Sequence, residues 1–106
     1  MLFTTHNDDE TLDANNTHLV GKITATRAQL SKVFGEPRVY GSGDGDGKVT
    51  LEWIIYFNDG TLSTIYDWKR YKLGTPGDNE VEEYHIGGRD FKAVTNVCDT
   101  FNMAVA

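Results

Sequence analysis

The stretch that decides the fold is KVTLEWIIYFNDGTLSTIYDWK, residues 48–69. In its first half the apolar residues at odd positions are Val49, Leu51, Trp53, Ile55 and Phe57. Successive side chains of a strand point to opposite faces, so this alternation predicts a strand whose odd face is core. The even positions are mixed and hold Thr50, Glu52, Ile54 and Tyr56. We expect this second face to be half covered or to meet a partner, with Glu52, Ile54 and Tyr56 as candidate interface residues.

The triplet at 58–60, Asn-Asp-Gly, is a hairpin turn signal, and residues 61–69 are the expected return strand. Two registers fit. A two-residue turn places Trp53 opposite Tyr66, but it also sets two acidic side chains opposite each other. A three-residue turn with the glycine in the left-handed conformation places Trp53 opposite Ile65 and avoids that pair. The sequence leaves both open.

Working outward towards the N-terminus, the pattern predicts a helix over about 27–34. Thr26 and Gln29 form a T-x-x-Q capping box at its start. Gly35 stands where a left-handed cap is expected, and Pro37 prevents continuation.

Towards the C-terminus, Asp90 is the expected cap of a second helix over about 91–104. Its apolar stripe is Phe91, Val94, Val97 with Cys98, and Phe101. Before it, residues 81–86 predict a strand, which the Gly87–Gly88 pair is expected to break.

The remaining segments complete the expected architecture. Residues 19–24 and 38–40 are candidates for short strands, and residues 1–18 predict a mobile acidic N-terminal arm. Residues 19–106 then form a single α+β domain of order (β)-α-β-β-β-α. We expect an antiparallel three- to four-stranded sheet with two helices packed on one face.

Composition limits the classes of function. The chain has 106 residues, enough for one domain, and a net charge of −6. That charge disfavours direct binding to nucleic acid and favours basic partners or solubility. The only cysteine, the absence of a basic leader and the absence of an apolar run near ~20 residues predict a cytoplasmic protein without a membrane span.

No motif predicts catalysis, a metal or a cofactor. The Gly-Asp loop at 42–47 resembles the start of a calcium loop, but Trp53 stands where a bidentate glutamate is required. His6, His18 and His85 lack zinc-ligand spacing, and we expect His85 at an edge or on the surface. Cys98, on the apolar stripe, is expected to be a buried structural thiol.

The segment after the hairpin interleaves aromatic and basic residues. Its candidate binding residues are Tyr66, Trp68, Lys69, Arg70, Tyr71 and Lys72, together with Arg89. Aromatic rings beside cations make stacking platforms for nucleotides and are also common interface anchors. The alternative is that Tyr66 and Trp68 belong to the core and that the basic residues are a solvated strand end.

Several runs together resemble small uncharacterised proteins encoded by bacteriophages. The runs are LSKVFGEP at 30–37, VTLEWIIYFNDGT at 49–61, TIYDWK at 64–69 and HIGG at 85–88. The resemblance covers most of residues 26–100, without the arm and the Gly-Asp loop. It implies a phage-type accessory protein working in the bacterial host cytoplasm. Together with the lack of a catalytic motif, this predicts a non-enzymatic protein that binds a host protein, such as a defence or nucleic-acid-handling factor. Two alternatives stay open: a small-ligand or nucleotide binder using residues 66–72, and a homo-oligomeric structural component. A homodimer is compatible with all three.

Overall fold

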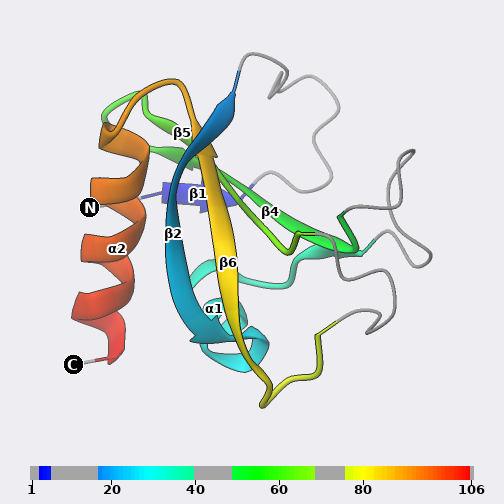
Figure 1. The fold of residues 1–106 in the computed structure, drawn as a ribbon. Helices are drawn as coiled ribbons and strands as arrows, with labels where there is room; N and C mark the ends of the chain where they lie inside the picture. The colour runs from blue at the N-terminus through cyan, green and yellow to red at the C-terminus, as the bar shows by residue number, and fades with distance from the viewer. Residues whose placement is uncertain (1–2, 6–16, 40–48, 69–75, 106) are drawn as a thin grey trace.

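The computed structural model describes residues 3–5, 17–39, 49–68 and 76–105 (Figure 1). Its strands are β1 (Phe3–Thr5), β2 (His18–Thr26), β3 (Arg38–Val39), β4 (Leu51–Phe57), β5 (Leu62–Tyr66) and β6 (Val81–Gly88). Its helices are α1 (Arg27–Phe34) and α2 (Lys92–Val105). The predicted α+β class is confirmed.

The strands form one antiparallel sheet in the order β1-β4-β5-β6-β2, and β3 also pairs with β4. The sheet has six strands and is larger than predicted. Two of them are only two and three residues long, and they pair with opposite halves of β4. Residues 3–5 therefore belong to the sheet, not to an arm that ends at residue 18. His18, the last residue of the expected arm, is likewise the first residue of β2, and Thr17 directly precedes it. The rest of the expected arm lies outside the described residues.

The β4–β5 hairpin adopts the second of the two registers. Trp53 lies opposite Ile65, and Glu52 lies opposite Tyr66. The Phe57 N–H donates to the Thr61 carbonyl at 2.8 Å, which closes a three-residue turn. Gly60 has φ +90°, a conformation that favours glycine. The like-charge pair of the other register is thereby avoided.

One face of the sheet carries the core, as the alternation in β4 predicts. Leu51, Trp53, Ile55 and Phe57 are all fully buried. The Trp53 indole N–H donates to the Gly35 carbonyl at 2.6 Å, which ties β4 to the end of α1. Both helices pack on this face (Figure 1), where Leu30 and Phe34 of α1 join the same apolar cluster as residues of α2.

The capping box at the start of α1 is as predicted, whereas Gly35 at its end has ψ −177° and not the expected left-handed helical conformation. The Thr26 hydroxyl accepts from the Gln29 N–H at 3.1 Å, and the Gln29 side chain accepts from the Thr26 N–H at 2.9 Å. Gly35 ends the helix at φ +86°, and its N–H donates to the Ser31 carbonyl. Local capping residues therefore mark both ends of this helix, and contacts from elsewhere add to them, because the Ala28 N–H donates to the Asp78 carbonyl at 2.9 Å.

The predicted apolar stripe of α2 is wrong at its first position. The Asp90 carboxylate accepts from the Lys92 N–H at 2.9 Å, so the helix begins just after Phe91. Phe91 is 67% exposed, whereas Ala93 and Val97 are fully buried. Phe91 precedes the helix and lies outside the buried arc that contains those two residues.

The Gly87–Gly88 pair does not break β6, contrary to the prediction. Both glycines lie within the strand, paired with β5 on one side and β2 on the other. A Cβ on Gly88 would collide with the Ala93 side chain, and one on Gly87 would collide with the Thr64 hydroxyl. The pair is thus explained by close packing on both faces of the sheet. Because β6 is an interior strand, His85 is not at an edge of the sheet, and of the two predicted positions the surface one remains, since its side chain is half-buried.

Candidate functional site

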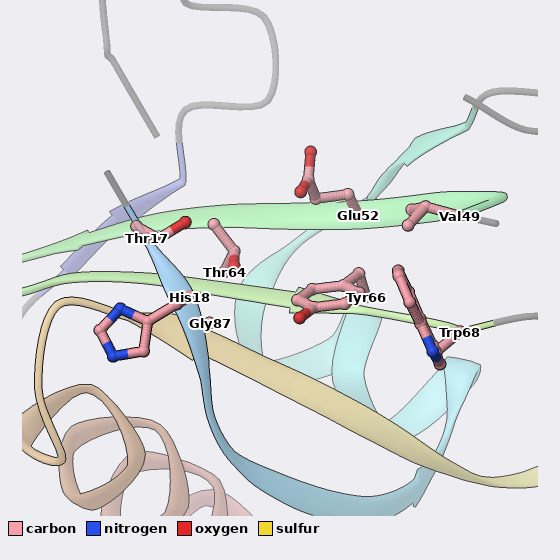
Figure 2. A pocket seen from close by; sticks show the side chains of 8 residues that line it. All are labelled: Thr17, His18, Val49, Glu52, Thr64, Tyr66, Trp68 and Gly87. Carbon is pink, nitrogen blue, oxygen red and sulfur yellow. The ribbon is translucent and has the colours of Figure 1, made fainter. Parts of the chain in front are cut away.

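The face of the sheet opposite the two helices, which we call the second face, holds a small pocket (Figure 2). Its volume is about 210 Å³. The residues that line it come from β2, β4, β5, β6 and adjoining positions: Thr17, His18, Val49, Glu52, Thr64, Tyr66, Trp68 and Gly87. Residues far apart in sequence are therefore brought to one place by strand pairing.

Three aromatic side chains, Tyr66, Trp68 and His85, form a mutually contacting group beside this pocket, which we call the aromatic cluster. The Trp68 and His85 rings stack, with centroids 5.7 Å apart and planes 25° apart. Tyr66 meets both edge-on, at centroid distances of 6.1 Å to Trp68 and 5.6 Å to His85. Each ring is oriented by the other two, so the cluster is a pre-organised surface.

Asp67 fixes the chain where it leaves β5. This carboxylate is fully buried and accepts from the Thr50 N–H at 2.7 Å, the Thr50 hydroxyl at 2.5 Å and the Leu51 N–H at 3.0 Å. These bonds tie the end of β5 to the start of β4. Trp68 follows directly, so its position depends on this anchor.

Gly87 and Thr64 form part of the pocket wall. They lie opposite each other on β6 and β5, and the Thr64 side chain is buried against the glycine backbone. A Cβ on Gly87 would also come within 3.4 Å of the Tyr66 ring. The absence of a side chain at Gly87 therefore makes room for both neighbours.

The surroundings of Tyr66 and His85 favour the neutral form of each ring. Burial, with help from the negative charge of Glu52, raises the pKa of Tyr66 above its usual value, so the phenol keeps its proton. Burial, followed by the positive charge of Lys22, lowers the pKa of His85, which favours the neutral imidazole. Among the described residues that line the pocket, Glu52 is the charged group.

The structure brings together three of the predicted site residues: Glu52, Tyr66 and Trp68. Trp68 is 38% exposed and Tyr66 is half-buried, so neither is a core residue. The interpretation of these two rings as core is thereby set aside.

The other predicted site residues do not line this pocket among the described residues. Two of the candidate interface residues differ in exposure. Ile54 is buried and is not available at the surface, whereas Tyr56 is exposed. Arg89 lies near the opposite end of β5 and lines a separate hollow with Asp59 and Lys92. Lys69, Arg70, Tyr71 and Lys72 lie outside the described residues.

Sequence reasoning missed the contributions of His18, Thr64, His85 and Gly87. A partial signal was present, because His85 and Gly87 alternate with the buried Tyr84 and Ile86 and must share the other face. What the sequence did not supply was the strand order that sets β6 between β5 and β2.

Among the residues that the structure describes, no group of three or more His, Cys, Asp or Glu side chains could hold a metal ion. The Gly-Asp loop at 42–47 lies outside them.

Cys98 is half-buried, and burial followed by the charge of Asp99 raises the pKa of its thiol. No helix in the described segments is long and apolar enough to cross a membrane.

Comparisons with protein-family models, with curated proteins and with solved structures find no match to this chain. The resemblance to bacteriophage proteins therefore stays a prediction, and the site must be interpreted from its own geometry.

Proposed function

We propose that this chain is a non-enzymatic binding protein that recognises another protein through the second face of its sheet. Following the resemblance, we further propose that it is a phage accessory protein and that its target is a host protein, such as a defence or nucleic-acid-handling factor. The observation that carries the proposal is the aromatic cluster, whose most exposed ring, Trp68, borders a pocket.

Protein interfaces supply the physical reason. A few buried tryptophan, tyrosine and arginine side chains commonly provide most of the binding energy of an interface. Trp68 and Tyr56 are exposed aromatics on the second face, and the Trp68 ring is already ordered by His85. Little side-chain entropy is then lost when a partner covers it.

The size of the pocket argues against the nucleotide alternative. Pockets for small molecules usually measure about 300–1,000 Å³, whereas this one measures about 210 Å³. Arg89, which was expected to help hold an anionic ligand, lies elsewhere. A single side chain of a protein partner suits this volume better.

Quantitative capture from a bacterial host lysate tests the proposal. Wild type, Trp68→Ala and Phe91→Ala are immobilised at equal density after circular dichroism shows that each is folded. Phe91 is the matched control, because it is also an exposed aromatic but precedes α2, away from the pocket. We expect Trp68→Ala to lose a specific host protein that wild type and Phe91→Ala retain.

Equal recovery by all three proteins would remove the second face as the binding surface. Added salt supplies an independent measurement, since the net charge of −6 should attract a basic target. We expect capture to weaken as salt rises from about 0.05 to 0.5 M, where the Debye length shortens to a few ångströms.

A further inference from the structure

The strand β2 forms one edge of the sheet. It lies beside β6 on one side, and among the described residues no segment pairs with its other side (Figure 1). At the opposite end of the sheet, by contrast, the short strands β1 and β3 cover the outer side of β4. An open edge presents backbone N–H and C=O groups to which another strand can be added.

The alternation of hydrogen bonds across the sheet shows which residues of β2 point outward. The Phe57 N–H donates to the Thr61 carbonyl, so these two residues form a hydrogen-bonded pair. Such pairs alternate with non-hydrogen-bonded pairs along antiparallel strands, and the N–H and C=O of one residue point to the same side. When this alternation is followed through β4, β5 and β6, Ile23 of β2 directs its backbone groups to β6. Its neighbours Lys22 and Thr24 therefore direct theirs outward.

Two features limit the part of this edge that can pair. A bulge just before Gly21 interrupts the regular strand at one end. At the other end the outward N–H of Thr26 already donates to the Gln29 side chain at 2.9 Å. The pairing edge is therefore formed by the backbone groups of Lys22 and Thr24, two residues that are both exposed.

We infer that this edge pairs with the same edge of a second copy of the chain, in an antiparallel dimer centred on Ile23. In this register Lys22 lies opposite Thr24 of the partner subunit, and the two residues exchange N–H···O=C bonds on each side of the two-fold axis. A register centred on Lys22 would set two lysines opposite each other. A register centred on Thr24 would set Lys22 opposite Thr26 of the partner subunit, whose N–H is already used.

The side chains of β2 suit this self-pairing. A lysine on an edge strand usually opposes pairing with another chain. Here the Lys22 ammonium is paired with the Glu83 carboxylate of its own chain at 3.3 Å, and the residue opposite it is the neutral Thr24 of the partner subunit. On the core side of the sheet, Gly21 lies opposite Ala25 of the partner subunit, and both are small. The inference does not rest on the proposed function, because neither Lys22 nor Thr24 lines the pocket.

Analytical ultracentrifugation over a range of about 0.01–1 mM protein tests the dimer. Two short edges bury little surface, so we expect weak association, with half of the chains dimeric at about 0.1–1 mM. Thr24→Pro removes an outward N–H from each copy, whereas the matched control Thr24→Ala keeps it. We expect wild type and Thr24→Ala to dimerise and Thr24→Pro to stay monomeric.

A second pair of variants tests the register and leaves the backbone intact. Thr24→Lys sets a positive charge opposite Lys22 of the partner subunit, and Thr24→Glu sets a negative charge there. Circular dichroism first shows that each variant is folded. We expect Thr24→Lys to weaken dimerisation about threefold or more and Thr24→Glu to strengthen it by a similar factor, because cross-strand charge pairs have these signs. If Thr24→Pro does not fold, this pair decides.

A wild type that stays monomeric at about 1 mM would overturn the inference, because weak standard-size contacts are populated at that concentration. A dimer that Thr24→Lys and Thr24→Glu leave unchanged would overturn it as well. So would a dimer that is lost in Trp68→Ala and kept in Thr24→Lys, since its contact would then lie on the second face. Host-protein capture by Thr24→Lys separates the two proposals, because we expect this variant to retain the host protein.

Discussion

Replacing Asp67 with alanine should destabilise the fold more than any change at the pocket itself. The carboxylate is fully buried and accepts three hydrogen bonds, two of them from backbone N–H groups at the start of β4. A hydrogen bond to a charged group contributes about 1.5–3 kcal/mol, and a buried donor left without an acceptor costs about 1–3 kcal/mol. Water entering the vacated space would restore part of this lost free energy. We therefore expect Asp67→Ala to lower the free energy of unfolding by about 3–5 kcal/mol.

Asparagine is the informative comparison at this position. One carboxylate oxygen, Oδ1, accepts from both the Thr50 and the Leu51 N–H, and the other, Oδ2, accepts from the Thr50 hydroxyl. An asparagine can keep its carbonyl at the first position and donate its amide to the hydroxyl. We expect Asp67→Asn to cost about 1 kcal/mol, because the two backbone donors stay satisfied.

Urea denaturation at 25 °C, followed by circular dichroism, measures both variants. Thr50→Ala completes a double-mutant cycle with Asp67→Ala, and we expect coupling because the two residues share a bond. If Asp67→Ala lowered the free energy of unfolding by less than about 1 kcal/mol, the role of Asp67 as an anchor would be refuted, since water would then replace all three hydrogen bonds without cost.

Three other perturbations test the packing and the ionisable groups. Gly88→Ala should cost about 1–3 kcal/mol in urea denaturation through its collision with Ala93, whereas Gly77→Ala, with open space around it, should be near neutral. Hydrogen bonds from Thr61 and then Asn96 hold the pKa of Asp59 well below its ordinary 3.8. The ionised Asp59 should therefore contribute its full stabilisation above that pH and lose it progressively below. A difference in free energy of unfolding between wild type and Asp59→Asn that stayed constant with pH would contradict this. Cys98, whose pKa is raised, should react with a disulfide reagent more slowly at pH 7 than a free cysteine, and an equal rate would show that burial does not protect it.

The parts of the fold that were predictable from sequence rest on local chemistry. The alternation in β4 identified the core face, and Thr26, Gln29 and Gly35 identified both ends of α1. The register of the hairpin was narrowed to two choices by the turn residues alone. Each signal lies within about ten residues of the structure it determines, so no tertiary information was needed.

The failures share a different cause. Gly87 and Gly88 were interpreted through their low strand propensity, but their role is to admit Thr64 and Ala93, which arrive from other elements. Phe91 satisfied helical spacing, yet it precedes α2 and its side chain is exposed. In both cases tertiary packing decided what a local rule could not.

Part of the candidate site was predictable from sequence and part was not, again because local signals are visible in the sequence and tertiary packing is not. Tyr66 and Trp68 stand in one continuous segment whose aromatic character is plain in the sequence. His85 reaches the second face, and the His18 backbone reaches the pocket, only because β6 pairs with β5 and then with β2. A strand order cannot be read from composition or spacing, so residues contributed by distant strands were missed.

The neighbours Asp67 and Trp68 separate stability from recognition. Asp67 is buried against the start of β4, and Trp68 contacts the cluster on the second face. Trp68→Ala should lose about 0.5–1.5 kcal/mol per aromatic contact while losing most of the partner binding. Asp67→Asn should lose comparable stability but keep the Trp68 ring in place and so keep the partner. If both variants instead lost stability and binding in the same proportion, the second face would be only a structural surface, and Trp68 would act through folding rather than through contact.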